Sequence, residues 1–299
     1  MSNLLSIIVC TYNRSEWLDG CLSSLESQCA NLPIEILVVD NNSSDSTASI
    51  VERFHKQSPA IKYIFERRQG LSYARNRGFM EAEGELVAYI DDDARACPGW
   101  IEAILKFFKD YPDATGVGGQ HKAFSSEPVP KWFPREYGTR SLGQETRLLK
   151  NNEWISGTNM VFKKSALVNA GGFDTEIGMN GRKVSYGEET NLILRMLGSG
   201  LRIYYCAEMH VEHAILPYKL TLRWLLKSNF ANGYDGVSTF KYHGSAIHYL
   251  PIVTRSIGKA IGLFVRSKEK YLKTRIYRSM AKLAWDLGFF TRLLGVKIR

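Results

Sequence analysis

Short apolar runs alternate with helical patterns through about the first 120 residues, and this alternation constrains the fold more than any other feature of the chain. The pattern predicts strands at residues 4–10, 34–39, 61–65 and 86–90. It predicts helices at about residues 15–27, 70–83 and 99–109, and a further helix that begins after the capping residues 41–45 and ends at about residue 56. A strand–helix–strand order implies a mostly parallel sheet with right-handed crossovers and helices on its faces. The expected fold class is therefore α/β.

Three consecutive acids, Asp91, Asp92 and Asp93, end the apolar run at residues 86–90. Such a run is typical of a buried parallel strand, and open α/β sheets bind ligands just beyond the carboxyl ends of their strands. Neighbouring carboxylates repel one another unless a cation neutralises them, and Mg²⁺ or Mn²⁺ takes oxygen ligands and bridges to phosphate. The triplet therefore predicts a divalent metal site, the alternative being a solvated acidic loop.

The ends of the first two strands add polar residues to the same edge of the sheet. Tyr12 follows the first strand, where its ring could stack on a planar base or simply belong to a capped loop. Asp40 ends the second strand, where it could accept hydrogen bonds from a base or a ribose, or cap the next helix. Arg75 lies one turn into the helix after Gly70, where a guanidinium could clamp a phosphate or an aspartate, or face solvent.

The second half of the chain offers a general base and a further ligand. Residues 121–153 are expected to form an irregular loop or flap, and a helix is expected at 187–199. Glu188 and Glu189 open that helix, either as a base for an acceptor hydroxyl or because acids are favoured in a first turn. A strand at 201–205 is expected to precede His210 and His213, and His213 is either a metal or phosphate ligand or a structural residue.

Charge divides the chain into two parts. Residues 214–299 hold 16 Lys and Arg against 3 acids, a net charge of +13, whereas residues 1–213 hold 23 against 27, a net charge of −4. The pattern from about residue 216 is helical and basic, which suits an anionic membrane surface, although helices packed on the catalytic part with a solvated basic face explain it equally well. A nucleic-acid partner is not expected, because no recognised binding motif accompanies the charge.

The sequence also bears on the cellular compartment. It shows no secretory signal pattern and no apolar stretch long enough to predict a spanning helix. The five cysteines form no C-x-x-C pair, and four lie in or beside apolar runs, as free thiols in a reducing compartment do. The expected location is cytoplasmic, with possible peripheral attachment to the inner face of the cytoplasmic membrane.

Several ordered motifs together resemble family 2 glycosyltransferases of the GT-A fold, over about residues 4–215. They are SIIVCTYNR at residues 6–14, VVDNNSSD at 38–45, GLSYARN at 70–76, the aspartate triplet, SGTNM at 156–160 and GEE at 187–189. The resemblance implies a Rossmann-like catalytic domain at residues 1–215, with a nucleotide-binding half at about 1–120 and an acceptor half at 121–215. A helical basic extension at 216–299 follows.

The resemblance also implies roles for individual residues. Asp91 and Asp93 would be the D-x-D pair, and together with His213 they would form the metal site. Glu189 would be the base. Many relatives have Asp after a Glu at that point, so Glu-Glu leaves open which glutamate acts. The residues that would bind the nucleotide sugar are Thr11, Tyr12, Asn13, Arg14, Asp40, Arg75, Asp91 and Asp92, and those that would line the sugar pocket are Trp154, Gly157 and Asn159.

The implied activity is an inverting transfer of a sugar, dependent on Mn²⁺ or Mg²⁺, from a nucleotide donor to a hydroxyl of a glycan or lipid-linked acceptor in cell-surface polysaccharide synthesis. A UDP-sugar is the first expectation for the donor. One alternative is a non-catalytic component that binds nucleotide sugars or glycans. The other is a sugar nucleotidyltransferase, which usually needs a Gly-rich basic loop where this chain has Thr11-Tyr12-Asn13-Arg14.

Overall fold

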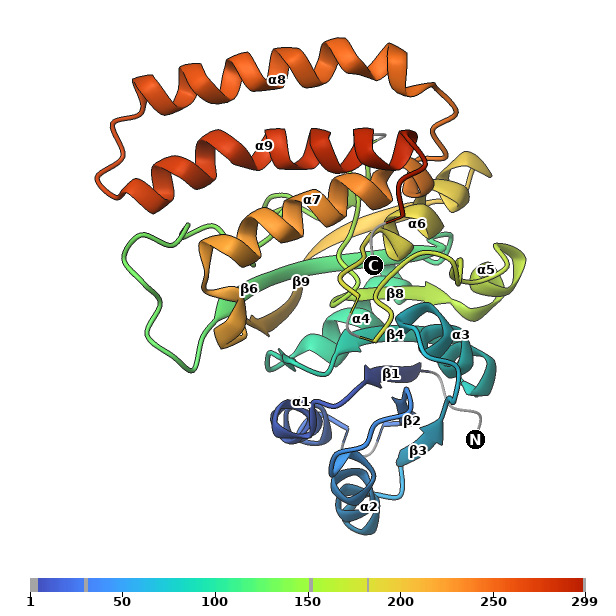
Figure 1. Ribbon diagram of the computed structural model, residues 1–299. Coiled ribbons are helices and arrows are strands. Elements are labelled where there is room, and N and C mark those ends of the chain that lie inside the picture. The colour runs from blue at the N-terminus through green and yellow to red at the C-terminus, as the bar shows by residue number, and fades with distance from the viewer. Residues whose placement is uncertain (1–4, 30–31, 151–152, 182, 298–299) are drawn as a thin grey trace. The chain divides into compact units, whose positions relative to one another are not determined.

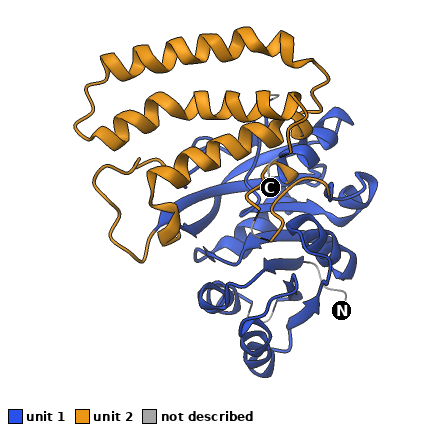
Figure 2. Ribbon diagram, viewed as in Figure 1, with its two compact units in different colours: residues 1–124, 138–175, 189–214 blue, residues 125–137, 176–188, 215–299 orange. Residues whose placement is uncertain are grey.

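A computed structural model describes residues 5–29, 32–150, 153–181 and 183–297. The chain divides into two compact units (Figure 2). Unit 1 comprises residues 1–124, 138–175 and 189–214, and unit 2 comprises residues 125–137, 176–188 and 215–299. Each unit is described by itself.

Unit 1 begins with four parallel strands in the order β3-β2-β1-β4 (Figure 1). These strands are β1 (Leu5–Thr11), β2 (Ile34–Asp40), β3 (Ile61–Phe65) and β4 (Leu86–Asp91). The helices that alternate with them are α1 (Ser15–Glu26), α2 (Thr47–Gln57), α3 (Leu71–Glu81) and α4 (Trp100–Asp110). The predicted α/β fold is confirmed, and Leu4, the expected start of the first strand, lies outside the described residues.

The second half of the sheet is mixed in direction. β8 (Met160–Lys163) runs antiparallel to both β4 and β6 (Gly116–Phe124), whereas β6 and β9 (Ile203–Ala214) are parallel. Two short strands, β5 (Ala94–Ala96) and β7 (Arg147–Leu148), pair antiparallel with β9. The helices in this half are α5 (Lys164–Asn169) and α6 (Glu188–Gly198). Parallel pairing therefore holds throughout the N-terminal strands but not beyond β4.

Two expectations for the second half were wrong in detail. The segment at 121–153 is not wholly irregular, because β6 continues to Phe124 and β7 lies within the segment. The strand expected at 201–205 continues to Ala214, so His210 and His213 lie within β9 rather than after it. Buried Met209 and Val211 alternate there with polar residues, which is the period-two pattern of a half-buried strand.

The core of unit 1 covers both faces of the sheet. Successive residues of β1 point to opposite faces, so Ile7 and Val9 join the cluster that includes Trp100, whereas Ile8 joins the cluster that includes Phe162. All five side chains are at most 1% exposed. Because the strands are packed on both faces, the polar residues at their carboxyl ends have fixed positions along one edge of the sheet.

Unit 2 is built mainly from three helices, α7 (Leu222–Thr239), α8 (Ala246–Arg266) and α9 (Leu272–Leu293), with a 3₁₀ turn at Pro217–Lys219. The backbones of α7 and α9 touch at a glycine, because a Cβ on Gly288 would lie 2.0 Å from the Phe230 carbonyl oxygen. α8 packs on α9 (Figure 1). None of the helices in the described part of the chain is both long and apolar enough to cross a bilayer.

Candidate active site

The register of the parallel strands aligns the predicted polar ends. Thr11 pairs with Asp40 across β1 and β2, and Cys10 pairs with Asp91 across β1 and β4. The loop after β1 is tied to the loop after β2, because the Asn13 backbone N–H donates to the Ser43 hydroxyl at 2.9 Å. The Asn13 side-chain oxygen in turn accepts from the backbone N–H of residue 44 at 2.7 Å. The two loops thus form one surface at the carboxyl edge.

Asp40 is held firmly at this edge. Asp40 is 3% exposed. One of its carboxylate oxygens accepts from the Tyr63 hydroxyl at 2.7 Å, and the other accepts from the Ser43 backbone N–H at 2.8 Å. Each carboxylate oxygen has a second lone pair, so these bonds leave acceptor capacity. Tyr12, on the neighbouring loop, is half-buried.

Asp91, Asp93 and His213 converge at the end of β4. One ligand atom from each lies within 4.8 Å of the others. The His213 Nε2 atom is 3.0 Å from an Asp93 oxygen and 3.9 Å from an Asp91 oxygen. Strand pairing produces this contact, because β9 places His213 opposite Ala94, the residue after Asp93. Two carboxylates and an imidazole form a donor set that suits a divalent cation such as Mn²⁺, so these residues fit the predicted metal.

Arg14 supports the acidic triplet from the loop after β1. Its Nη1 atom lies 3.1 Å from an oxygen of Asp92 and 3.1 Å from an oxygen of Asp93. Burial raises the pKa of Asp92 to about 6, an effect that the nearby Arg14 guanidinium opposes and the Asp93 carboxylate reinforces. Asp92 is 3% exposed and lies outside the Asp91–Asp93–His213 cluster, so its observed contact is with Arg14.

Arg75 is buried beside Asp91. The residue is 3% exposed, and its Nη2 atom lies 3.4 Å from an Asp91 oxygen. Its guanidinium also stacks over the Phe173 ring at 5.4 Å from the centroid. Gly157 makes room for it, because a Cβ at that position would lie 2.5 Å from Nη2. Glycine in the SGTNM motif therefore lets the arginine lie against the backbone.

Asn159 has a structural role in the described fold. Its side chain donates to the carbonyl oxygens of Gln120 and Met209, both at 2.9 Å, and accepts from the Trp100 indole N–H at 2.9 Å. The residue is 0% exposed, and these bonds use both amide protons. Asn159 therefore joins β6, β9 and α4, and it is too deeply buried to touch a sugar.

Two residues that the sequence did not single out lie beside this cluster. His121 and Arg140 exchange backbone hydrogen bonds of 3.0 and 2.8 Å, and the His121 ring meets the His213 ring edge-on at 5.8 Å between centroids. Burial lowers the pKa of His121 to about 4, with the neighbouring His213 acting in the same direction. The His121 imidazole is therefore neutral near pH 7 and places no second positive charge beside His213.

Arg140 faces the exposed ring of Trp154. Its guanidinium lies 4.4 Å from the ring centroid, and its Nη2 atom donates to the Trp154 carbonyl oxygen at 2.7 Å. Its Nε atom is buried without a hydrogen-bond partner, and no carboxylate in the described ranges lies within ion-pair distance. Burial lowers the pKa of Arg140, whereas the negative charges of Glu153 and Glu189 act against that shift. Arg140 is therefore a cation close to Glu189 that has no direct acidic partner.

The two glutamates at the start of α6 differ in access. Glu188 is 5% exposed, and a Cβ on Gly178 would lie 2.9 Å from one of its carboxylate oxygens. Glu189 is half-buried and lies within electrostatic reach of Arg140. A base must reach the hydroxyl that it deprotonates, and Glu189 is the more exposed of the two carboxylates.

Comparison with known proteins agrees with this architecture. The sequence matches the model of the family described as glycosyl transferase family 2 over residues 6–169, more than half of the chain. It is 28% identical over 240 residues to a protein of Haloferax volcanii named glucosyl-dolichyl phosphate glucuronosyltransferase, a match that spans 77% of this chain and 75% of that protein.

Two solved structures share the fold. The mannosyltransferase PcManGT from Pyrobaculum calidifontis, in complex with GDP-Man and Mn²⁺, is similar with a TM-score of 0.57 and 18% identity, over 99% of this chain and 75% of that one. S. aureus TarS 1-349, in complex with UDP-GlcNAc, has a TM-score of 0.59 and 15% identity, over 98% of this chain and 91% of that one. The chain therefore belongs to glycosyl transferase family 2 and is a glycosyltransferase with the GT-A fold.

Proposed function

We propose that this enzyme transfers a sugar, with inversion and with a divalent cation, from a UDP-sugar to a hydroxyl of a glycan or lipid-linked acceptor in cell-surface polysaccharide synthesis. The observation that carries the proposal is the convergence of Asp91, Asp93 and His213 at the carboxyl edge of the sheet. The cationic partners of the triplet, half-buried Arg14 and buried Arg75, add positive charge where a diphosphate would lie.

The nucleotide is assigned to the surface formed by the loops after β1 and β2. Asp40 is fixed by Tyr63 and Ser43 and keeps acceptor capacity for a base N–H or a ribose hydroxyl. Tyr12 is half-buried on the adjoining loop, where its ring can stack on a base. Support for a nucleotide-sugar donor comes from the GDP-Man and UDP-GlcNAc complexes of the two structural neighbours. The preference for uridine follows from the resemblance of the base-reading residues to those of uridine users.

Asp93 and His213 would hold the cation, with Asp91 beside them. Mn²⁺ or Mg²⁺ bound there would neutralise the charge that develops on the departing nucleoside diphosphate. Arg75 would orient Asp91, since its guanidinium is 3.4 Å from that carboxylate and is fixed against Gly157. Asp92 would keep Arg14 in place rather than touch the donor.

Glu189 is the proposed general base, in preference to Glu188. It would take the proton of the acceptor hydroxyl while that oxygen attacks the anomeric carbon from the face opposite the leaving group. A single base on that face, with no covalent intermediate, gives inversion. The packing of Glu188 supports this choice, because its carboxylate lies against Gly178 whereas Glu189 is half-buried and within electrostatic reach of Arg140.

Arg140 is a proposed positioning residue for Glu189. A cation without a carboxylate in direct contact favours the deprotonated state of a nearby base. Its stacking partner Trp154, which is 42% exposed, offers a flat apolar face to a sugar ring. The proposed sugar pocket thus consists of Trp154 and Gly157, and Asn159 is left out because its hydrogen bonds are used internally.

The acceptor is proposed to be lipid-linked. The name of the Haloferax relative, whose match spans three quarters of both chains, states a dolichyl phosphate sugar as substrate. We assign catalysis to residues 1–215 and a peripheral membrane role, at the cytoplasmic face, to the basic extension at 216–299. The net charge of +13 over residues 214–299 favours this role.

Turnover of purified protein with a panel of UDP-, GDP- and dTDP-sugars, with and without Mn²⁺, tests the proposal. Release of UDP that requires both Mn²⁺ and a polyprenyl-phosphate-linked sugar is the expected result. Equal turnover in the presence of a metal chelator would contradict the assigned metal site. Turnover with water-soluble glycans alone would contradict the lipid-linked acceptor.

A further inference from the structure

α8 presents three distinct surfaces along its length. Its inner face packs in unit 2 through residues that recur every three or four positions and are at most 7% exposed, namely Tyr249, Val253, Ser256 and Ala260. This face is narrow, and the rest of the helix is largely exposed. Figure 2 shows α8 at the outer edge of unit 2. A helix of 21 residues therefore contacts its unit along a single stripe.

The outer face of α8 is apolar although it is exposed. The side chains along it recur at helical spacing and are Ile247, Leu250, Ile257, Ile261 and Val265. Their exposed fractions are 74%, 46%, 42%, 61% and 68%, respectively. Single exposed apolar residues are common, but a continuous stripe marks an interaction surface. We call these five residues the apolar stripe.

A row of basic residues runs along the opposite flank of the exposed side of α8, roughly 140° around the helix axis from the apolar stripe. It consists of His248, Arg255, Lys259 and Arg266, which are 7, 4 and 7 positions apart and so lie on one flank of the helix. All four are exposed, and α8 contains no Asp or Glu. An exposed apolar stripe accompanied by three cations, Arg255, Lys259 and Arg266, with no acid on the helix, suits a helix that lies in the plane of an anionic bilayer.

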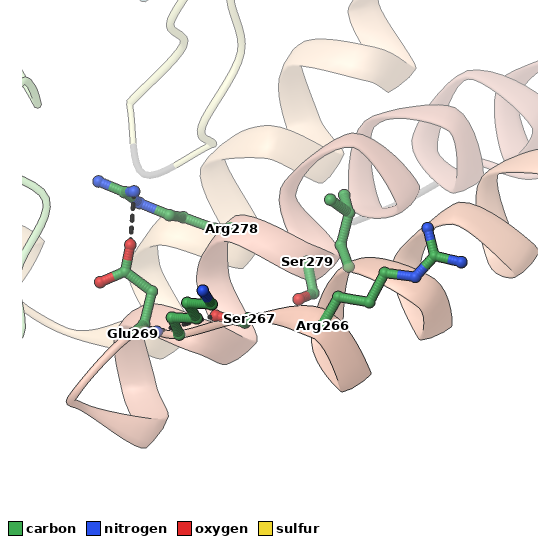
Figure 3. A pocket seen from close by; sticks show the side chains of 7 residues that line it. Arg266, Ser267, Glu269, Arg278 and Ser279 are labelled. Carbon is green, nitrogen blue, oxygen red and sulfur yellow. Dashed lines mark hydrogen bonds and ion pairs between the residues drawn. The ribbon is translucent and has the colours of Figure 1, made fainter.

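The basic row leads into a cavity at the turn between α8 and α9. Its volume is about 390 Å³, and its lining includes Lys268 together with Arg266, Ser267, Glu269 and Arg278, the last four of which are labelled in Figure 3. Arg278 is paired with Glu269 at 2.5 Å, whereas no carboxylate in the described part of the chain lies within ion-pair distance of Arg266 or Lys268. Arg266 and Lys268 therefore add positive charge at this end of α8, beside the Arg278–Glu269 pair.

We propose that α8 lies in the interface of an anionic membrane, with the apolar stripe among the acyl chains and the basic row, together with the cavity at Arg266 and Lys268, on lipid phosphates. Charge complementarity selects this occupant, because a partner protein would need a strongly acidic apolar surface to match the same helix. The inference extends the membrane location under "Proposed function". It does not depend on Glu189 or on turnover.

The test is flotation of the full-length protein with vesicles of phosphatidylcholine alone or of an equal mixture with phosphatidylglycerol. Wild-type protein is expected to float only with the mixed vesicles. The double variant Arg255→Gln/Lys259→Gln should lower the partition coefficient about 30-fold, taking about 1 kcal/mol per charge and about 1.4 kcal/mol per factor of ten. The matched control Lys56→Gln/Lys109→Gln removes two exposed charges from unit 1 and should leave partition unchanged.

The apolar stripe is tested separately with Ile257→Ser/Ile261→Ser. This variant should lose on the order of a hundredfold in partition even at low salt, because two side chains no longer enter the acyl region. The control Val168→Ser, at a residue of unit 1 that is 57% exposed, should bind as wild type does. Circular dichroism of each variant verifies that the helices remain folded.

Four results would overturn the proposal. They are equal binding to neutral and mixed vesicles, an equal loss in the charge control, release from vesicles by millimolar inorganic phosphate alone, and vesicle-free dimerisation that Ile257→Ser/Ile261→Ser abolishes. The last two would assign the cavity to free phosphate or the stripe to a second copy of the chain. Glu189→Gln should float as wild type does, so a failure of the proposed chemistry and a failure of membrane docking are told apart.

Discussion

Exchanging Glu189 for Gln tests the assignment of the base, and Glu188→Gln provides a matched control one residue away. Gln keeps the size of the side chain and its place in the first turn of α6 but cannot accept a proton at neutral pH. General-base catalysis contributes roughly 10²- to 10⁴-fold, or about 2.7–5.4 kcal/mol of barrier. Glu189→Gln is therefore expected to lower kcat by at least about 100-fold.

The control is expected to separate catalysis from stability. Glu188 is 5% exposed and lies against Gly178, so Glu188→Gln should lower the free energy of unfolding. Its kcat should fall much less than that of Glu189→Gln. The assay is UDP release at saturating donor and acceptor, with UDP affinity measured by calorimetry for both variants. UDP affinity should be unchanged in Glu189→Gln. A kcat for Glu189→Gln close to that of wild type, or a larger loss of kcat in Glu188→Gln, would refute the assignment.

Three further predictions concern other parts of unit 1. Gly157→Ala should weaken UDP-sugar binding in calorimetry without abolishing folding, because its methyl group would displace Arg75, now 2.5 Å from that position; wild-type affinity would contradict the contact. Arg140→Gln should move the acidic limb of the kcat–pH profile to higher pH, because a nearby cation no longer favours the deprotonated base, and Arg140→Lys should largely restore it; an unmoved limb would limit Arg140 to a structural role. Burial raises the pKa of Glu35, but hydrogen bonds from Ser6, Lys62 and the Glu83 backbone N–H outweigh it and hold that pKa below its usual value. A depressed folded-state pKa gives stability that is present above the unfolded-state pKa of about 4.3 and is lost as pH falls. The free energy of unfolding in urea should therefore fall more steeply with decreasing pH for wild type than for Glu35→Gln. Parallel pH dependences of the two proteins would contradict the linkage.

Much of the N-terminal half was predictable because its signals are local. The largely apolar strands β1, β2 and β4 end in polar residues, and parallel pairing then brings Thr11, Asp40 and Asp91 to one edge. The alternation of strands and helices permits few other arrangements. The ends of the helices and strands in this half consequently differ from the predicted ends by no more than about two residues.

The second half was less predictable because its contacts are long-range. β6 opens with Gly116-Val117-Gly118-Gly119, and glycine weakens a strand signal. The outer part of β9 carries polar residues on one face, so it lacks the continuous apolar run of a fully buried strand. His121 and Arg140 meet the cluster only through pairing of distant segments, which periodicity within one segment does not reveal.

The burial of individual side chains also could not be predicted from the sequence. Asn159 belongs to the same motif as Gly157, yet its hydrogen bonds to Gln120 and Met209 place it inside the fold. Burial likewise separates Glu188 from Glu189, although both are carboxylates in one helical turn. Such differences depend on which neighbours cover a side chain, and only the packed structure supplies them.

Calorimetric titration of UDP, with and without Mn²⁺, tests the central claim that Asp91, Asp93 and His213 form a cation site for the donor diphosphate. Wild-type protein should bind UDP more tightly when Mn²⁺ is present, and Asp93→Ala should show the same weak affinity under both conditions. Asp92→Asn, a change at the residue that pairs with Arg14, should retain the dependence on Mn²⁺. A full Mn²⁺ enhancement of UDP binding in Asp93→Ala would contradict the account.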